Sequence, residues 1–266
     1  MSEQERRWKV EMGITVNDKK YSEEHQVSDN MTLFKEYFGN FNVDVVSDLL
    51  AHVDIWLAEA LGLPHFSSRK VYVIHVDDNP KCATSPSLDV IMLATEGDFW
   101  CQWVYQFAHE YCHHLIADGP YDEGPSELLW FEETICELSS MYCLHRMIDY
   151  CLESPSPSLR HYAPSVQGYL VGNNKGQKVS VPLHSYIEER AHLMSRSDRH
   201  REMHTHIAGE MLPLFLQCPS LWRMILHFGD MSEWHSLSQL FDHLREEADA
   251  TYAASLEELR SLLLGS

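Results

Sequence analysis

The segment FAHEYCHHLI, which begins at Phe107, holds two histidines separated by three residues, with a glutamate next to the first. In an α-helix, residues four positions apart lie about 40° apart around the axis, so His109 and His113 share one face and can bind one metal ion. Glu110 lies beside this face, where it can reach a water on the ion. His114 lies about 140° from His109 and is not expected to join them. The spacing is that of the H-E-x-x-H motif of metal-assisted hydrolysis.

The motif alone is weak evidence, because the chain contains 17 histidines. About one chain in ten of this composition would carry the motif by chance. The alternative is an amphipathic helix whose polar face happens to carry histidines. Apolar residues before the motif (WVYQFA) and after it (LI) favour a largely buried helix. Buried histidines and carboxylates need partners, and a metal ion would supply one for both histidines at once.

A second helical segment, SELLWFEETICELSSMYCL, places three glutamates among apolar residues. Neighbouring positions of a helix point about 100° apart, so only one of Glu132 and Glu133 can face a given ion. Glu133 and Glu137 are four residues apart and share a face. Carboxylates buried in such a helix are rarely without a partner. The residues alone therefore allow either Glu132 or Glu133 as a third ligand.

His109-Glu110-x-x-His113, followed about twenty residues later by a glutamate on a second helix, resembles the gluzincin clan of zinc metallopeptidases. Thermolysin and the thermolysin-like aminopeptidases belong to this clan. The resemblance implies a Zn²⁺ ion held by His109, His113 and Glu133, with Glu110 as the general base. It also implies that Glu137 orients a ligand histidine from behind the metal site.

Two details of the resemblance choose Glu133 rather than Glu132 as the ligand. The thermolysin pattern has an acidic residue four positions after the ligand glutamate, and Glu137 matches it. The run Trp130-Phe131-Glu132-Glu133 also resembles the aminopeptidase W-L-N-E run. We therefore expect Glu132 to be dispensable for zinc binding. The resemblance covers roughly residues 70–150, and the aminopeptidase motif G-x-M-E-N is absent from the sequence, so amino-terminal exopeptidase activity is not supported.

Three protein ligands leave one tetrahedral position open, which is typical of catalytic zinc. A water there would have a pKa of about 7, and Glu110 would pass its proton to the leaving amine. The expected partner is a peptide or protein substrate. The alternative function is that of a zincin-fold binding or regulatory protein with zinc but little general proteolytic activity. An intact Glu110 favours chemistry, because a binding module does not need it.

The clan usually adds a Tyr or His from the C-terminal half to stabilise the oxyanion. The candidates here are Tyr186, His192, His200 and His204. Spacing from the ligand glutamate favours His192 or His200 but does not choose between them. His200 and His204 are four residues apart in DRHREMHTH, but no carboxylate completes a known metal pattern. We therefore expect these two histidines to lie on a solvated helix face.

The elements that must position these residues follow from periodicity and turn signals. Together they predict an α+β fold with a small sheet, two central helices and a helical C-terminal lobe. The resemblance implies that the small sheet and the two active-site helices form a zincin-like core. The expected division is an α/β domain at 1–153, a linker at 154–182 and the lobe at 183–266. The resemblance places a substrate-pairing edge strand just before the motif helix. The expected segments are a helix at 42–61, strands at 70–76 and 88–94 with a loop between them, the motif helix ending near 117, and the second helix at 127–151.

Composition excludes several classes of function. The formal net charge of −20 is opposite to that of nucleic-acid-binding proteins and disfavours an anionic membrane surface. The sequence has no apolar stretch of about eighteen residues, and its start, MSEQERRWKV, lacks the apolar run of a secretory signal. Seven cysteines without a CxxC pair favour reduced thiols. We therefore expect a cytoplasmic protein with no nucleic-acid or membrane partner.

Overall fold

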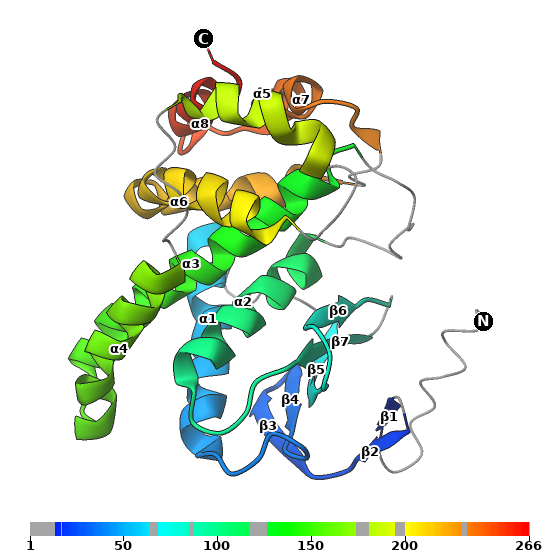
Figure 1. The fold of residues 1–266 in the computed structure, drawn as a ribbon, viewed down its shortest axis with the longest axis vertical. Helices are drawn as coiled ribbons and strands as arrows, with labels where there is room; N and C mark the ends of the chain where they lie inside the picture. Colours follow the sequence, from blue (N-terminus) through cyan, green and yellow to red (C-terminus); the bar gives the residue numbers. More distant parts are fainter. Residues whose placement is uncertain are drawn as a thin grey trace.

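The chain forms a mixed α+β structure in which a sheet lies beside a group of packed helices (Figure 1). The structure is a computed structural model. It describes residues 14–16, 18–63, 69–85, 88–116, 127–173, 181–194, 200–229 and 233–265. The expected end of the motif helix at residue 117 and the loop that follows it lie outside these residues.

The described strands form a two-stranded sheet, β1–β2, and a five-stranded sheet in the order β3-β4-β5-β7-β6. In the larger sheet, β4, β5 and β7 are parallel, and the outer strands β3 and β6 are antiparallel to their neighbours. The strands are β1 (Ile14–Val16), β2 (Lys19–Tyr21), β3 (Glu24–Ser28), β4 (Met31–Phe34), β5 (Lys70–His75), β6 (Lys81–Ala83) and β7 (Leu88–Leu93).

The expectation that the strand before the motif helix forms the edge of the sheet is wrong. The strand β7 pairs with β5 on one side and with β6 on the other, so β6 is the edge strand. We expected a loop where β6 lies. A strand of only three residues is too short to show an alternating pattern, so the sequence predicts a loop there, and the resemblance points to the next strand along the chain.

The sheet is buried on both faces near its centre, which explains the continuous apolar run of β7. Successive side chains of a strand point to opposite faces. Ile91 and Leu93 accordingly belong to the main hydrophobic core, while Val90 and Met92 join a small cluster on the other face with Tyr21 of β2.

The helix α1 (Val43–Leu61) begins and ends as the sequence predicts. The side chain of Asn42 accepts a hydrogen bond from the Val45 backbone N–H at 3.2 Å and caps the first turn. Gly62 ends the helix with a φ of 71°, a left-handed conformation that glycine adopts without a Cβ clash.

The motif helix α2 (Trp100–Ile116) lies between α1, the sheet and the second helix, α3 (Leu129–Glu153). In turn, α3 packs against α2, α4 and α6, so its central turns are buried almost all round. One cluster of buried side chains runs from Met31 in β4 to Leu263 in α8 and joins both parts of the chain. The remaining helices are α4 (Pro157–Asn173), α5 (Leu183–Met194), α6 (Arg201–Gln217), the 3₁₀ helix η1 (Pro219–His227), α7 (Leu237–Glu247) and α8 (Ala253–Leu264).

The helix α4 occupies most of the stretch 154–182, so the expectation of a linker is wrong for Pro157–Asn173. Proline at the first position of a helix costs little, because the missing N–H would have no partner there. Pro164 lies inside the helix, where it removes one backbone hydrogen bond. Burial against α3 offsets this cost through apolar side chains on one face, namely Leu159, Ala163 and Val166.

Two expectations about composition can be compared with the described residues. All seven cysteines are free, which confirms the prediction of reduced thiols. Among the described helices, none combines the length and apolarity needed to cross a bilayer.

Candidate metal centre

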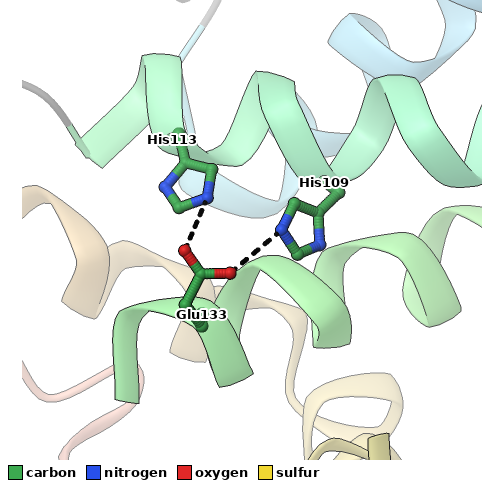
Figure 2. Close-up of side chains that lie close together, drawn as sticks. All are labelled: His109, His113 and Glu133. Carbon is green, nitrogen blue, oxygen red and sulfur yellow. Dashed lines mark ion pairs between the residues drawn. The ribbon is translucent and has the colours of Figure 1, made fainter. Parts of the chain in front are cut away.

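His109, His113 and Glu133 come together between α2 and α3 (Figure 2). The Nε2 atoms of His109 and His113 each lie 3.4 Å from a different carboxylate oxygen of Glu133. One ligand atom from each residue lies within 4.8 Å of the other two. In the part of the chain that the structure describes, this is the group of His, Cys, Asp and Glu side chains found close enough to hold a metal ion. The helical spacing therefore places the two histidines as expected.

The three side chains are partly accessible although the helices around them are buried. Their relative side-chain exposure is 19% for His109, 15% for His113 and 25% for Glu133. Glu132 and Glu137, which are on the same helix, are almost fully buried. A small ion or molecule can thus reach the three donors from solvent, while the carboxylates of Glu132 and Glu137 are shielded from water.

Each histidine has a second carboxylate at its other ring nitrogen. Nδ1 of His113 is 2.8 Å from Oε1 of Glu132, and Nδ1 of His109 is 3.7 Å from Oε2 of Glu137. A carboxylate at Nδ1 holds the proton there and leaves Nε2 free to bind a metal. Glu137 thus lies at the ring nitrogen of His109 that does not face Glu133. Glu132 does not take the ligand position, as the resemblance implies, but the 100° turn between neighbouring residues directs its carboxylate to the back of His113.

Opposing effects set the charges in this cluster. Burial alone would lower the pKa of His109, but the nearby carboxylates of Glu133 and Glu137 outweigh it and raise the pKa to about 9. Burial is likewise outweighed at His113, where Glu132 and Glu133 raise the pKa well above its usual value. Burial would raise the pKa of Glu133, but the two histidines hold it far below its usual range. Protons and a metal ion therefore compete for the same imidazole nitrogens.

Glu110 differs from the ligand carboxylate in its surroundings. It is only 6% exposed, and burial raises its pKa above the usual value for a glutamate. The positive histidines lower the pKa, and the backbone N–H of Cys82 in β6 lowers it by hydrogen bonding to the carboxylate. A carboxylate with a raised pKa next to a metal-ligand cluster is suited to accept a proton near neutral pH.

Short polar side chains hold α3 against α2. Oγ of Ser139 donates a hydrogen bond to the carbonyl oxygen of Ala108 at 3.0 Å, and Oγ of Ser140 donates to that of Tyr105 at 2.8 Å. These two bonds fix the register of the ligand helix relative to the motif helix. The position of Glu133 opposite the two histidines follows from that register.

A buried ion-pair cluster anchors the far side of α2 to the sheet. His114 makes a hydrogen bond through Nδ1 to Asp89 of β7, and both side chains are almost fully buried. Nη2 of Arg69 lies 3.3 Å from the Asp89 carboxylate and donates to the His114 carbonyl oxygen at 2.6 Å. The third histidine of the motif segment thus points away from the metal ligands, as its helical position predicts.

The structure separates the four candidates for oxyanion stabilisation. Tyr186 lies on α5, where its ring packs against a histidine ring of α6, and the side chain of His192 lies outside the described residues. His200 directly precedes α6 and is half-buried. His204 is buried, and its Nδ1 is 3.0 Å from Oγ1 of Thr134 on the ligand helix. The expected solvated face is therefore wrong for His204, because this side of α6 packs against α3.

The donor set fits a metal ion. It supplies two imidazole nitrogens and one carboxylate from two rigid helices, and each imidazole has a carboxylate at its other nitrogen. Comparison of the chain with protein-family models, with curated proteins and with solved structures finds no match.

Proposed function

We propose that the chain is a zinc-dependent hydrolase with a zincin-like core, and that it cleaves peptide bonds. The observation that carries the proposal is the convergence of His109, His113 and Glu133 from two helices. Two imidazoles and a carboxylate are a donor set of catalytic zinc, and three protein ligands leave one coordination position for substrate or water. The same residues carry the resemblance to gluzincins.

The histidines would hold the ion through Nε2, and Glu133 would hold it through its carboxylate. When bound, zinc lowers the pKa of a water and polarises a carbonyl group. Glu132 and Glu137 keep the Nδ1 protons of His113 and His109 in place, which fixes the ring orientation and tautomer.

Glu110 is the proposed general base. It would accept a proton from the attacking water and pass it to the leaving nitrogen. Its burial raises its pKa, so it binds that proton more readily than an exposed glutamate would. The backbone N–H of Cys82 orients the carboxylate from the side of β6.

The edge strand β6 is the proposed docking site for an extended peptide. Its outer backbone groups have no strand partner among the described residues, and such an edge can pair with a peptide by adding a strand to the sheet. The contact between Cys82 and Glu110 places the base beside this edge. A peptide paired with β6 would therefore run past Glu110. This assignment replaces β7, which is interior.

The test is a peptide-library digest with zinc-reconstituted wild type and Glu110→Gln. The substitution keeps the size of the side chain and removes the base. We expect the variant to bind zinc and fold like wild type but to lose hydrolysis by at least about a hundredfold, the scale of a general base. Glu153→Gln, an exposed glutamate at the end of α3, is the matched control and should keep full activity.

Two outcomes would contradict the proposal. Equal cleavage by wild type and Glu110→Gln would assign the activity to another base. Zinc binding without cleavage of any library peptide by wild type would favour the binding or regulatory protein instead.

A further inference from the structure

One oxygen of the Glu137 carboxylate accepts hydrogen bonds from two hydroxyl groups on different helices. Tyr105 of α2 donates a hydrogen bond to Oε1, and Oγ1 of Thr205 on α6 donates to the same oxygen at 2.7 Å. The other oxygen, Oε2, lies 3.7 Å from Nδ1 of His109. Glu137 is 1% exposed, so water does not compete for these contacts. The two oxygens therefore face different partners.

This arrangement constrains the rotation of the carboxylate. The terminal torsion of a glutamate is broad, so one donor would leave the group free to turn. Tyr105 is on the same helix as His109 and fixes Oε1 relative to that helix alone. Thr205 adds a second anchor from a helix 68 residues further along the chain. With Oε1 occupied from two directions, Oε2 is directed towards the histidine.

The oxygen that the two hydroxyl groups leave open, Oε2, faces Nδ1 of His109. An ionised carboxylate at Nδ1 keeps the proton on that nitrogen. The lone pair of Nε2 then points towards Glu133, where the metal would bind.

We propose that Thr205 is a positioning residue of the metal site, which acts by holding Glu137 so that its free oxygen orients His109. The proposal rests on the metal-binding part of the proposed function. It makes the helix α6 part of the metal site, although no residue of α6 belongs to the motif or to the ligand set. The metal affinity of the two motif helices thus depends on a helix of the C-terminal half.

The test compares the Zn²⁺ affinity of Thr205→Val, Thr205→Ser and Thr134→Val by competition with a chelating indicator. Valine keeps the shape of threonine and removes the donor, so we expect about tenfold weaker zinc binding, at the lower end of the range for outer-shell partners. Serine keeps the hydroxyl and should bind zinc within about threefold of wild type.

Thr134→Val is the matched control. It removes another buried threonine hydroxyl from the interface between α3 and α6, where the hydroxyl contacts His204 and not Glu137. We expect zinc affinity within about threefold of wild type. Thermal unfolding of the metal-free variants separates a loss of packing from a loss of metal affinity.

A double-variant cycle with Glu137→Ala tests the mechanism directly. If Thr205 acts through Glu137, adding Thr205→Val to Glu137→Ala should not weaken zinc binding further. Wild-type affinity in Thr205→Val, or an equal loss in the Glu137→Ala background, would overturn the proposal. If wild type itself binds no Zn²⁺, the proposed function fails; if wild type binds and Thr205→Val binds equally well, only the role of Thr205 fails.

Discussion

Replacing Glu132 tests whether the carboxylate behind His113 supports zinc binding. The resemblance to gluzincins chooses Glu133 as the ligand and makes Glu132 dispensable for zinc binding. In the structure its Oε1 is 2.8 Å from Nδ1 of His113, and its side chain is 1% exposed. We therefore expect Glu132→Ala to weaken zinc binding without removing a ligand.

The size of this effect follows from the geometry. A hydrogen bond to a charged group contributes about 1.5–3 kcal/mol, and about 1.4 kcal/mol corresponds to a tenfold change in affinity. The metal-free protein makes the same contact, so the substitution weakens both states and only part of this free energy appears in the zinc affinity. We therefore expect about a tenfold to hundredfold loss of zinc affinity, as for other outer-shell partners. Glu132→Gln keeps an acceptor oxygen but loses the charge, and it should bind zinc more tightly than Glu132→Ala.

The assay is zinc competition against a chelating indicator, with thermal unfolding of each metal-free variant as the control for folding. Glu133→Ala is measured alongside and should lose zinc almost completely, because it removes a ligand. Wild-type affinity in Glu132→Ala would refute the role of this carboxylate. Loss of zinc in Glu132→Ala with retention in Glu133→Ala would show that the ligand is Glu132 and that the proposed register is off by one residue.

Two further predictions concern pH and helix capping. The folded-state pKa of His109 is about 9, above its usual 6.5, so its ion pairs stabilise the metal-free protein fully below about pH 6.5 and this stabilisation is lost as pH rises through 9. Zinc affinity rises over the same pH range, because zinc binds neutral imidazoles. The difference in melting temperature between zinc-loaded and chelator-treated protein should therefore widen from pH 6 to pH 9. A constant or narrowing difference would contradict this prediction. Asn42→Ala removes the side-chain cap of α1 and should lower the free energy of unfolding by about 1 kcal/mol in urea titrations, whereas a loss below about 0.3 kcal/mol would show that the cap contributes little.

Parts of the fold with strong local signals could be predicted from the sequence. The ends of α1 follow from Asn42 and Gly62, whose capping chemistry is local. The strand β6 was missed because three residues show no period. The helix α4 was missed because its prolines and serines favour a loop, and only packing against α3 overrides that preference.

In the candidate site, local spacing predicts some residues, and only the packing of distant segments brings in the others. His109 and His113 share a face because helix geometry alone places them there. The contact of Glu132 with His113 depends on how α3 is rotated against α2, which local spacing does not determine. No local pattern in the sequence points to Thr205, because it lies 68 residues from Glu137 along the chain. The burial of His204 likewise arises from the packing of α6 on α3.

The most direct test of the central claim is the zinc content of the reconstituted chain, measured by native mass spectrometry after removal of unbound metal. Wild type should carry about one zinc ion per chain, because one three-ligand site is proposed. Glu133→Ala, with its helical content checked by circular dichroism, should carry almost none. A wild-type chain without zinc after reconstitution, or a Glu133→Ala chain that keeps its ion, would contradict the metal centre proposed for His109, His113 and Glu133.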